Sequence, residues 1–335
     1  MRFQDRRALV TGGLGFIGSN LVHALVREGA DVSLVDASLP GCGADLANVD
    51  GLPVEIHHDD IANPERFRHS IESADVIFNL AGDISHLESM RHPERDLDRN
   101  TRGQLRFVEA CARWNPGVRI LYASTRQVYG VPEYLPVDEA HPVNPVDFNG
   151  VHKYAAGQYH LMFARQGRLD ATILRLTNVY GPRISLTAPN QGFLASFVRR
   201  LLASEPLTVF GDGRQLRDPL YVDDAVEAFL MAALSTDRTA RAFNAGGLEA
   251  MSLFEIATTA SRVASVAPPK LAEFPDGLAS IDIGSYTTDW TLLHRTTGWR
   301  PAVRFEEGFR RTLEFFRARN TAPRAAEAAA VRLTS

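Results

Sequence analysis

Three glycines, Gly12, Gly15 and Gly18, constrain the fold of this chain more than any other feature of its sequence. They follow a short apolar run and precede an amphipathic segment, Phe16 to Glu28, which indicates a turn between a buried strand and a helix. In such a turn the first glycine permits the bend, the second lets the backbone approach a pyrophosphate, and the third lets helix and strand pack closely. The helix N-terminus then offers N–H groups to phosphate oxygens. The pattern predicts a dinucleotide site; a glycine-rich turn without a ligand is the alternative.

An acidic residue at the end of the next predicted strand supports the dinucleotide. Asp36 follows Gly18, the last glycine of the turn, by 18 positions, where a carboxylate can bond both hydroxyls of the adenosine ribose. The same carboxylate would repel a 2′-phosphate. The sequence therefore predicts NAD as the cofactor rather than NADP.

The order of apolar and amphipathic segments predicts the fold class. From Ala8 to about Arg175 they alternate, and the apolar runs are β-branched and nearly continuous, as in central parallel strands: RRALVTGG, DVSLVDA, PVEIHH, DVIFNLAG, VRILYAS and ATILRLTNVYG. This alternation is typical of an α/β fold with a Rossmann-type doubly wound parallel sheet. We expect an NAD-binding domain over 1–180 and a smaller C-terminal substrate-binding domain over 181–318, with some interleaving. Residues 319–335 should form a loose tail.

Composition excludes several partner classes. The 335 residues carry a formal net charge of −4, which gives no reason to expect nucleic acid or an anionic membrane. Apolar runs stay well short of the roughly 20 residues that span a bilayer, and a strand begins too near the N-terminus to leave room for a signal peptide. Two cysteines without metal-ligand spacing predict neither a disulfide framework nor a metal site. We therefore expect a cytoplasmic protein.

Several further motifs follow the glycine turn in a fixed order. They are Asp60-Ile61, Asn79-Leu80-Ala81-Gly82, Asn100 with Gly103, Ser124-Thr125 before Val128-Tyr129-Gly130, Arg175 to Pro182, Gly211 to Asp218, and Thr297 to Pro301. Together with TGGLGFIGSN they resemble the extended short-chain dehydrogenase/reductases, specifically the NAD-dependent nucleotide-sugar epimerase/dehydratase family. The resemblance covers nearly the whole chain.

The resemblance implies a set of binding residues. Asp60 and Ile61 would contact adenine, and Asn100 would brace the central helix. A nucleotide-diphosphate sugar would be held at its sugar oxygen by Thr125 and at its diphosphate by Asn178 and Arg217. Relatives dimerise through the helix after Asn100 and the helix carrying Lys153, which implies a homodimer. The full predicted cofactor-binding set is Gly12, Gly15, Phe16, Ile17, Gly18, Asp36, Asp60, Ile61, Leu80, Ala81, Gly82, Asn100 and Lys153.

One position departs from the family pattern. The family's catalytic pair is Tyr-x-x-x-Lys, one helical turn apart, whereas this chain has Asn149 four residues before Lys153. A tyrosine near an ammonium and an oxidised nicotinamide can take a proton from a sugar hydroxyl. An asparagine amide can hydrogen-bond that oxygen but cannot take the proton. General acid–base catalysis typically supplies about 10²–10⁴-fold in rate, so the substitution matters.

Three interpretations of Asn149 are open. In the first, a substitute proton carrier exists: His152, or Asp83 or His86 after the fourth strand. The plainer alternatives are that His152 is a surface residue and that Asp83 and His86 only bond substrate or loop backbone. In the second, the reaction needs no phenolate and Asn149 orients a hydroxyl. In the third, the protein binds NAD and a nucleotide sugar without turnover.

We therefore expect an NAD-dependent nucleotide-sugar epimerase or dehydratase that transiently oxidises the sugar at C4. Thr125 would hold the C4 oxygen and Lys153 would orient the nicotinamide ribose, while Asn149 replaces the usual base. The alternative is a catalytically weak or inactive protein that binds NAD and a nucleotide sugar.

Overall fold

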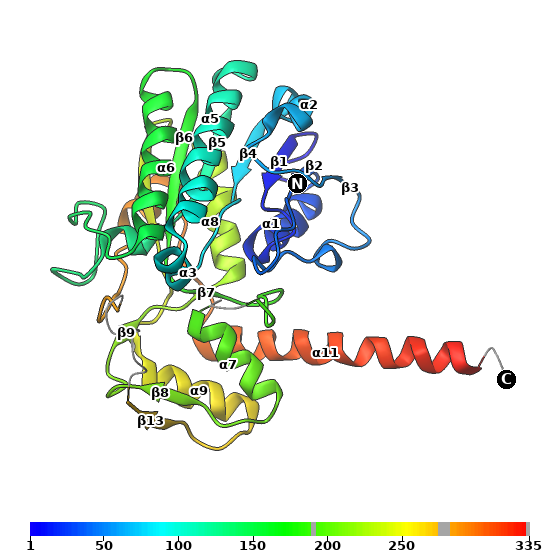
Figure 1. Cartoon of the computed structure of the whole chain (residues 1–335), viewed down its shortest axis with the longest axis vertical. Coiled ribbons are helices and arrows are strands. Elements are labelled where there is room, and N and C mark those ends of the chain that lie inside the picture. Colours follow the sequence, from blue (N-terminus) through cyan, green and yellow to red (C-terminus); the bar gives the residue numbers. More distant parts are fainter. Residues whose placement is uncertain (189–191, 274–281, 333–335) are drawn as a thin grey trace.

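A seven-stranded parallel sheet forms the centre of the computed structural model (Figure 1). The structure describes residues 1–188, 192–273 and 282–332, with side chains as far as Arg319. The strand order is β3-β2-β1-β4-β5-β6-β11, and every neighbouring pair is parallel. This order confirms the predicted Rossmann-type sheet. The strands are β1 (Arg7–Thr11), β2 (Asp31–Val35), β3 (Val54–His57), β4 (Val76–Asn79), β5 (Arg119–Thr125), β6 (Asp170–Leu176) and β11 (Arg241–Ala245).

The register of the central strands brings their carboxyl ends to one edge. Thr11, the last residue of β1, pairs with Val35 at the end of β2 and with Asn79 at the end of β4. All four residues of β4 are buried, as a strand covered on both faces requires. Loops that follow these strands therefore meet at the same edge, where ligands of open α/β sheets bind.

Helices cover both faces of the sheet. One face packs against α1 (Phe16–Arg27) and α8 (Val222–Leu234), and these helices share a core with β1, β2 and β4. The other face packs against α2 (Arg68–Ser73) and α5 (Gly103–Trp114), with α6 (Phe148–Arg165) beside α5. Between β4 and α5 the chain forms α3 (His86–Arg91), α4 (Pro93–Leu97) and a π-helical turn, η3 (Asp98–Arg102).

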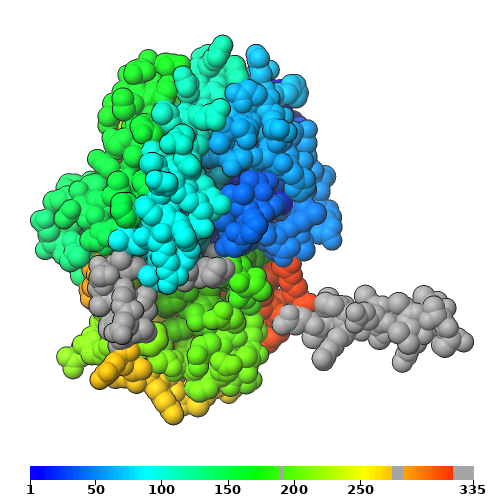
Figure 2. Space-filling model, viewed as in Figure 1, coloured from blue at the N-terminus to red at the C-terminus, as the bar shows by residue number. Residues whose placement is uncertain are grey.

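A second, smaller body lies against the carboxyl ends of the strands (Figures 1 and 2). Its core joins α7 (Gly192–Leu202), α9 (Leu253–Ala264), the start of α11 (Phe305–Arg332) and strand β8 (Thr208–Phe210), which pairs with β13 (Lys270–Ala272). Within the described ranges, no helix combines the length and apolar character that crossing a membrane requires. Shorter elements are η1 (Leu46–Asn48), η2 (Pro64–Phe67), η4 (Arg126–Tyr129), β7 (Val179–Tyr180), β9 (Leu216–Arg217), β10 (Leu220–Tyr221), β12 (Met251–Ser252) and α10 (Thr291–Thr297).

The two bodies exchange segments of the chain. Helix α8 and strand β11 follow residue 180 in the sequence, yet both belong to the first body. The sequence pattern did not indicate β11, because RAFNA is short and carries two polar residues. The tail expected over 319–335 continues helix α11 as far as Arg332, and 333–335 lie outside the described residues.

A buried ion pair ties the amino ends of the central strands. The Arg119 guanidinium, 6% exposed, contacts the Asp170 carboxylate and donates to the Ala232 carbonyl at 2.6 Å. Asp170→Ala leaves this guanidinium buried without its anion. We expect the free energy of unfolding to fall by about 2–3 kcal/mol in urea titrations. The control Arg238→Ala removes the exposed second partner of Asp170 and should change the free energy of unfolding by less than about 0.5 kcal/mol. Equal effects of the two variants would contradict this account.

Candidate active site

The glycine turn after β1 is built for close backbone contact. Gly12 has φ +71°, and a Cβ added there would lie 2.9 Å from the Ala81 nitrogen. A Cβ on Gly18 would lie 2.1 Å from the Gly12 oxygen, so only glycine lets α1 approach the turn. Gly15 caps α1 in an extended conformation without a side-chain hydrogen bond. The amides of the first turn of α1 are therefore available to an anionic ligand.

Asp36 lies at one end of the cavity that begins at this turn. Its carboxylate accepts hydrogen bonds from the backbone N–H groups of Leu14 (3.1 Å) and Ser38 (2.8 Å). Burial raises the pKa of Asp36, and these two bonds oppose the rise. Asp60 and Ile61 line the same end of the cavity. This end can hold a ribose beside a flat apolar ring.

The end of β4 supplies the next stretch of wall, Leu80, Ala81 and Gly82. A Cβ on Gly82 would lie 2.5 Å from the Asn100 Oδ1 and 2.8 Å from the Lys153 Nζ, so a larger residue is excluded. Buried Asn100 accepts from the Asp83 N–H (3.0 Å) and donates to the Asp83 carbonyl (3.1 Å). Asn100 thus braces the loop and lies behind the cavity wall.

A single cavity of about 370 Å³ connects these elements along the carboxyl ends of the strands. It collects most of the residues that the sequence singled out, and it leaves Asn100, His152 and Arg217 outside its lining. The predicted residues on its wall are Gly12, Gly15, Phe16, Ile17, Gly18, Asp36, Asp60, Ile61, Leu80, Ala81, Gly82, Asp83, His86, Thr125, Asn149, Lys153 and Asn178.

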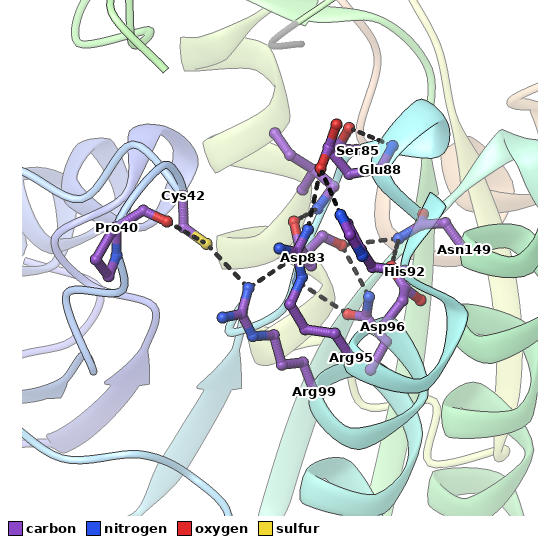
Figure 3. A network of polar contacts seen from close by, with 12 residues as sticks. Pro40, Cys42, Asp83, Ser85, Glu88, His92, Arg95, Asp96, Arg99 and Asn149 are labelled. Carbon is purple, nitrogen blue, oxygen red and sulfur yellow. Dashed lines mark hydrogen bonds and ion pairs between the residues drawn. The ribbon is translucent and has the colours of Figure 1, made fainter. Parts of the chain in front are cut away.

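Asn149 is a buried member of a polar network that runs through Asp83 (Figure 3). Its amide nitrogen donates to the Asp83 carbonyl and to the Asp96 Oδ2, both at 3.0 Å, and the residue is 1% exposed. The two amide hydrogens are therefore engaged, which leaves the amide oxygen as the group that can meet a ligand. Asn149 can accept a hydrogen bond from a hydroxyl, but its amide cannot act as a general acid or base.

Lys153 lies one turn further along α6, on the same face as Asn149. Burial lowers the pKa of Lys153 to about 8, although the negative charges of Asp96 and Asp83 oppose this. Its Nζ lies 5.6 Å from the centre of the Tyr122 ring. Thr125 ends β5 on the same cavity wall, and its hydroxyl accepts from the Gln127 N–H at 3.1 Å.

Two candidate proton carriers are committed to other partners. His152 is buried, unlike the surface residue considered as its alternative, and its Nδ1 lies 2.7 Å from the Asp96 Oδ1. It does not line the cavity. Asp83 does, but its carboxylate pairs with Arg99 at 2.9 Å (Figure 3).

The third candidate, His86, has a different arrangement. It lines the cavity, and its Nδ1 lies 3.0 Å from the Asp147 Oδ2. Burial by itself raises the pKa of Asp147, yet contact with His86 and hydrogen bonds from Gly150 and Gln127 outweigh it and hold that pKa below its usual value. The Nδ1 and Oδ2 atoms are close, but among the described residues their orientation does not meet hydrogen-bond geometry, so Asp147 lies beside Nδ1 without a hydrogen bond to it.

A second hollow, of about 560 Å³, continues the cavity into the smaller body. His86, Arg126 and Gln127 line both spaces. Arg217 lines the second hollow, where burial and the charge of Arg126 lower the pKa of Arg217 to about 10. Asn178 is joined to this region by Arg126, which donates to the Asn178 Oδ1 at 3.2 Å.

Sequence reasoning missed Asp147 and Arg126. A signal existed for each: Asp147 has the place of a helix N-cap before the glycine and lysine of α6, and Arg126 is a cation directly after a predicted active-site strand. No sequence pattern predicts that Asp147 lies beside His86, because the two residues come from separate segments.

The residues present fit a bound dinucleotide. Close glycine contacts, an uncapped helix N-terminus and the Asp36 carboxylate after β2 occur together along one cavity, at the switch point of a doubly wound sheet. Fold and cavity thus define a dinucleotide-binding α/β protein with room for a second ligand beside Thr125.

Residues 8–246 match the model of the NAD dependent epimerase/dehydratase family, and the chain belongs to this family. It is an NAD-dependent enzyme of the epimerase and dehydratase type. A UDP-glucose 4-epimerase of Mycolicibacterium smegmatis is 34% identical over 315 residues, which are 93% of this chain and 98% of that protein. UDP-glucuronic acid decarboxylase 1 of Arabidopsis thaliana is 30% identical over 93% of this chain and 70% of that protein. The crystal structure of a Thermotoga maritima UDP-glucose 4-epimerase with UDP-glucose matches this chain with a TM-score of 0.85 and 30% identity. The match covers 93% of this chain and 99% of that one.

Asp36 should set the preference for NAD. Asp36→Asn removes the charge that bonds the ribose and repels a 2′-phosphate, so we expect NAD to bind about 10-fold more weakly and the NAD-to-NADP preference to shrink. Titration calorimetry with both dinucleotides measures this. The control Asp59→Asn, at the same end of the cavity, should leave both affinities unchanged. Retention of the full preference by Asp36→Asn would contradict the assignment.

Proposed function

We propose that this enzyme converts a UDP-sugar through transient oxidation at the sugar C4. The observation that carries the proposal is the continuous cavity, which runs from Asp36 past Gly82 to Thr125 and opens toward Arg217. The relatives compared above are named for UDP-glucose and UDP-glucuronic acid, which supports a UDP-sugar as the second ligand.

Each cavity residue has a distinct part in this proposal. When bound, NAD supplies the hydride acceptor for the oxidation at C4. Thr125 holds the C4 oxygen, and the Lys153 ammonium orients the ribose of the cofactor. The Asn149 oxygen accepts a hydrogen bond from a sugar hydroxyl, since its two amide hydrogens serve Asp83 and Asp96.

The C4 hydroxyl proton must go to a group other than Asn149. We assign it to the His86 Nε2, because the Asp147 carboxylate lies 3.0 Å from Nδ1 and His86 lines the cavity where it meets the second hollow. The proton returns from Nε2 to the oxygen when C4 is reduced again, so the cycle is balanced. Asp83, paired with Arg99, and His152, behind the wall, are the weaker candidates.

One observation favours a second candidate function. Asn149 is fully engaged in a structural network and carries no acid or base, as expected in a protein that binds NAD and a UDP-sugar without turnover. The two candidates differ in the fate of the bound sugar nucleotide. Addition of UDP-glucose, UDP-galactose, UDP-N-acetylglucosamine or UDP-glucuronate to the holoenzyme should give transient NADH absorbance and a new sugar nucleotide by NMR. Binding of these ligands with neither signal would establish the alternative.

The His86–Asp147 pair should control the chemical step. We expect His86→Gln to lower kcat about 10²-fold with little change in the KM for the sugar nucleotide, because the proton acceptor is lost while packing is retained. Asp147→Asn keeps an N-cap for α6 and should lower kcat less. The control His92→Gln alters an exposed histidine just after α3. Unchanged kcat in His86→Gln would refute the assignment.

Lys153 should produce an alkaline limit on activity. The pKa of Lys153 is lowered to about 8, so its ammonium loses the proton as the pH rises through that value. Loss of the charge weakens its hold on the cofactor ribose, and kcat should therefore fall above about pH 8. Pre-steady-state rates across pH 6–10 measure this. Lys153→Arg keeps the charge at all these pH values and should move the limit upward. The same limit in both proteins would assign it to another group.

A further inference from the structure

Arg126 has hydrogen-bonding capacity that the protein does not use. It begins η4, directly after Thr125. Its Nη2 donates to Asn178, and its guanidinium lies 4.9 Å from the centre of the Tyr286 ring. Its Nη1 is buried, and among the described residues it has no hydrogen-bond partner. A buried cationic nitrogen without a partner is costly, which indicates that a ligand completes it.

The charges around Arg126 point to an anion. Burial lowers the pKa of Arg126, and the charges of Tyr286, Asp218, Asp282 and Asp147 oppose this. Among the described residues, however, no carboxylate forms an ion pair with Arg126. The nearby Asp218 carboxylate is engaged by the Thr177 hydroxyl (2.7 Å) and the Thr288 N–H (3.0 Å). Arg217, the second guanidinium of the hollow, already forms an ion pair with Asp282 at 3.6 Å, which leaves the charge of Arg126 without such a partner. The hollow therefore has unpaired positive charge that a negative group of a ligand would neutralise.

The position of Arg126 in the chain selects which part of the ligand it meets. Thr125 holds the C4 oxygen in the function proposed above, on which this inference rests, and Arg126 is the next residue. Arg217 and Asn178 remain for the diphosphate. On a hexose ring, C6 is attached to C5, the neighbour of C4. A group on C6 is thus within reach of the residue after Thr125.

We propose that Arg126 is a specificity residue that binds the C6 carboxylate of a UDP-uronic acid. A guanidinium pairs with a carboxylate through parallel hydrogen bonds, and burial strengthens the pair. A neutral hexose presents only a hydroxyl there and leaves Nη1 without a counter-charge. The enzyme therefore prefers UDP-glucuronate or UDP-galacturonate over UDP-glucose.

Titration calorimetry on the NAD-loaded enzyme tests this with UDP-glucuronate, UDP-glucose and UDP. The native protein should bind UDP-glucuronate at least about 10-fold more tightly than UDP-glucose. Arg126→Met should weaken UDP-glucuronate about 30-fold or more and change UDP-glucose and UDP by less than about 3-fold. Arg126→Lys, which keeps the charge, should retain part of the preference. The control Arg113→Met alters an exposed arginine at the end of α5, outside both cavities, and should change none of these affinities.

The outcomes separate this inference from the proposed function. Equal weakening of all three ligands in Arg126→Met would show that the guanidinium binds the diphosphate and would overturn the carboxylate assignment. Equal native affinity for UDP-glucuronate and UDP-glucose would overturn it as well, with the proposed function intact. Failure of the native holoenzyme to bind any UDP ligand would overturn the proposed function itself. Thermal unfolding with NAD confirms that Arg126→Met is folded, and Arg126→Lys answers the question if it is not.

Discussion

Backbone contact between the turn after β1 and the end of β4 is the constraint on which the rest of the site depends. A Cβ at Gly12 would meet the backbone at Ala81, and one at Gly82 would meet Asn100 and Lys153. Because no side chain intervenes, the two strand ends, the N-terminus of α1 and the middle of α6 share one cavity. The dinucleotide site and the catalytic face of α6 are therefore parts of one packing arrangement.

The residue at position 149 changes the chemistry of that arrangement without disturbing its structure. Asn149 links the Asp83 carbonyl to Asp96, which also holds His152, so the buried polar groups are satisfied. Satisfied networks of this kind fix a single geometry. In our proposal the proton chemistry moves to His86, held by Asp147 two residues before Asn149. The sugar end of the cavity thus keeps its cations, Lys153 and Arg126, and in our proposal the imidazole of His86, from α3, takes the role of the family's phenol.

The fold was largely predictable, since six strands of the sheet are continuous apolar runs with a characteristic turn after the first. Strand β11 was not, because its five residues carry no such pattern and its place beside β6 depends on long-range pairing. The predicted residues at the strand ends do line the cavity, because in each case the motif coincides with the end of a strand. His152 was misjudged as a possible surface residue because helical periodicity gives the face of a side chain and not what covers it.

The sequence by itself determined the parallel sheet, the glycine turn, the preference for NAD and the missing tyrosine, since each depends on local residue types and their spacing. Only the tertiary structure decided that His86 lies beside Asp147, that Asn149 is engaged by Asp83 and Asp96, and that an Arg126 nitrogen has no partner among the described residues beside a second cavity. The physical reason is that hydrogen-bond partners and burial are properties of segments distant in sequence, and packing alone brings them together.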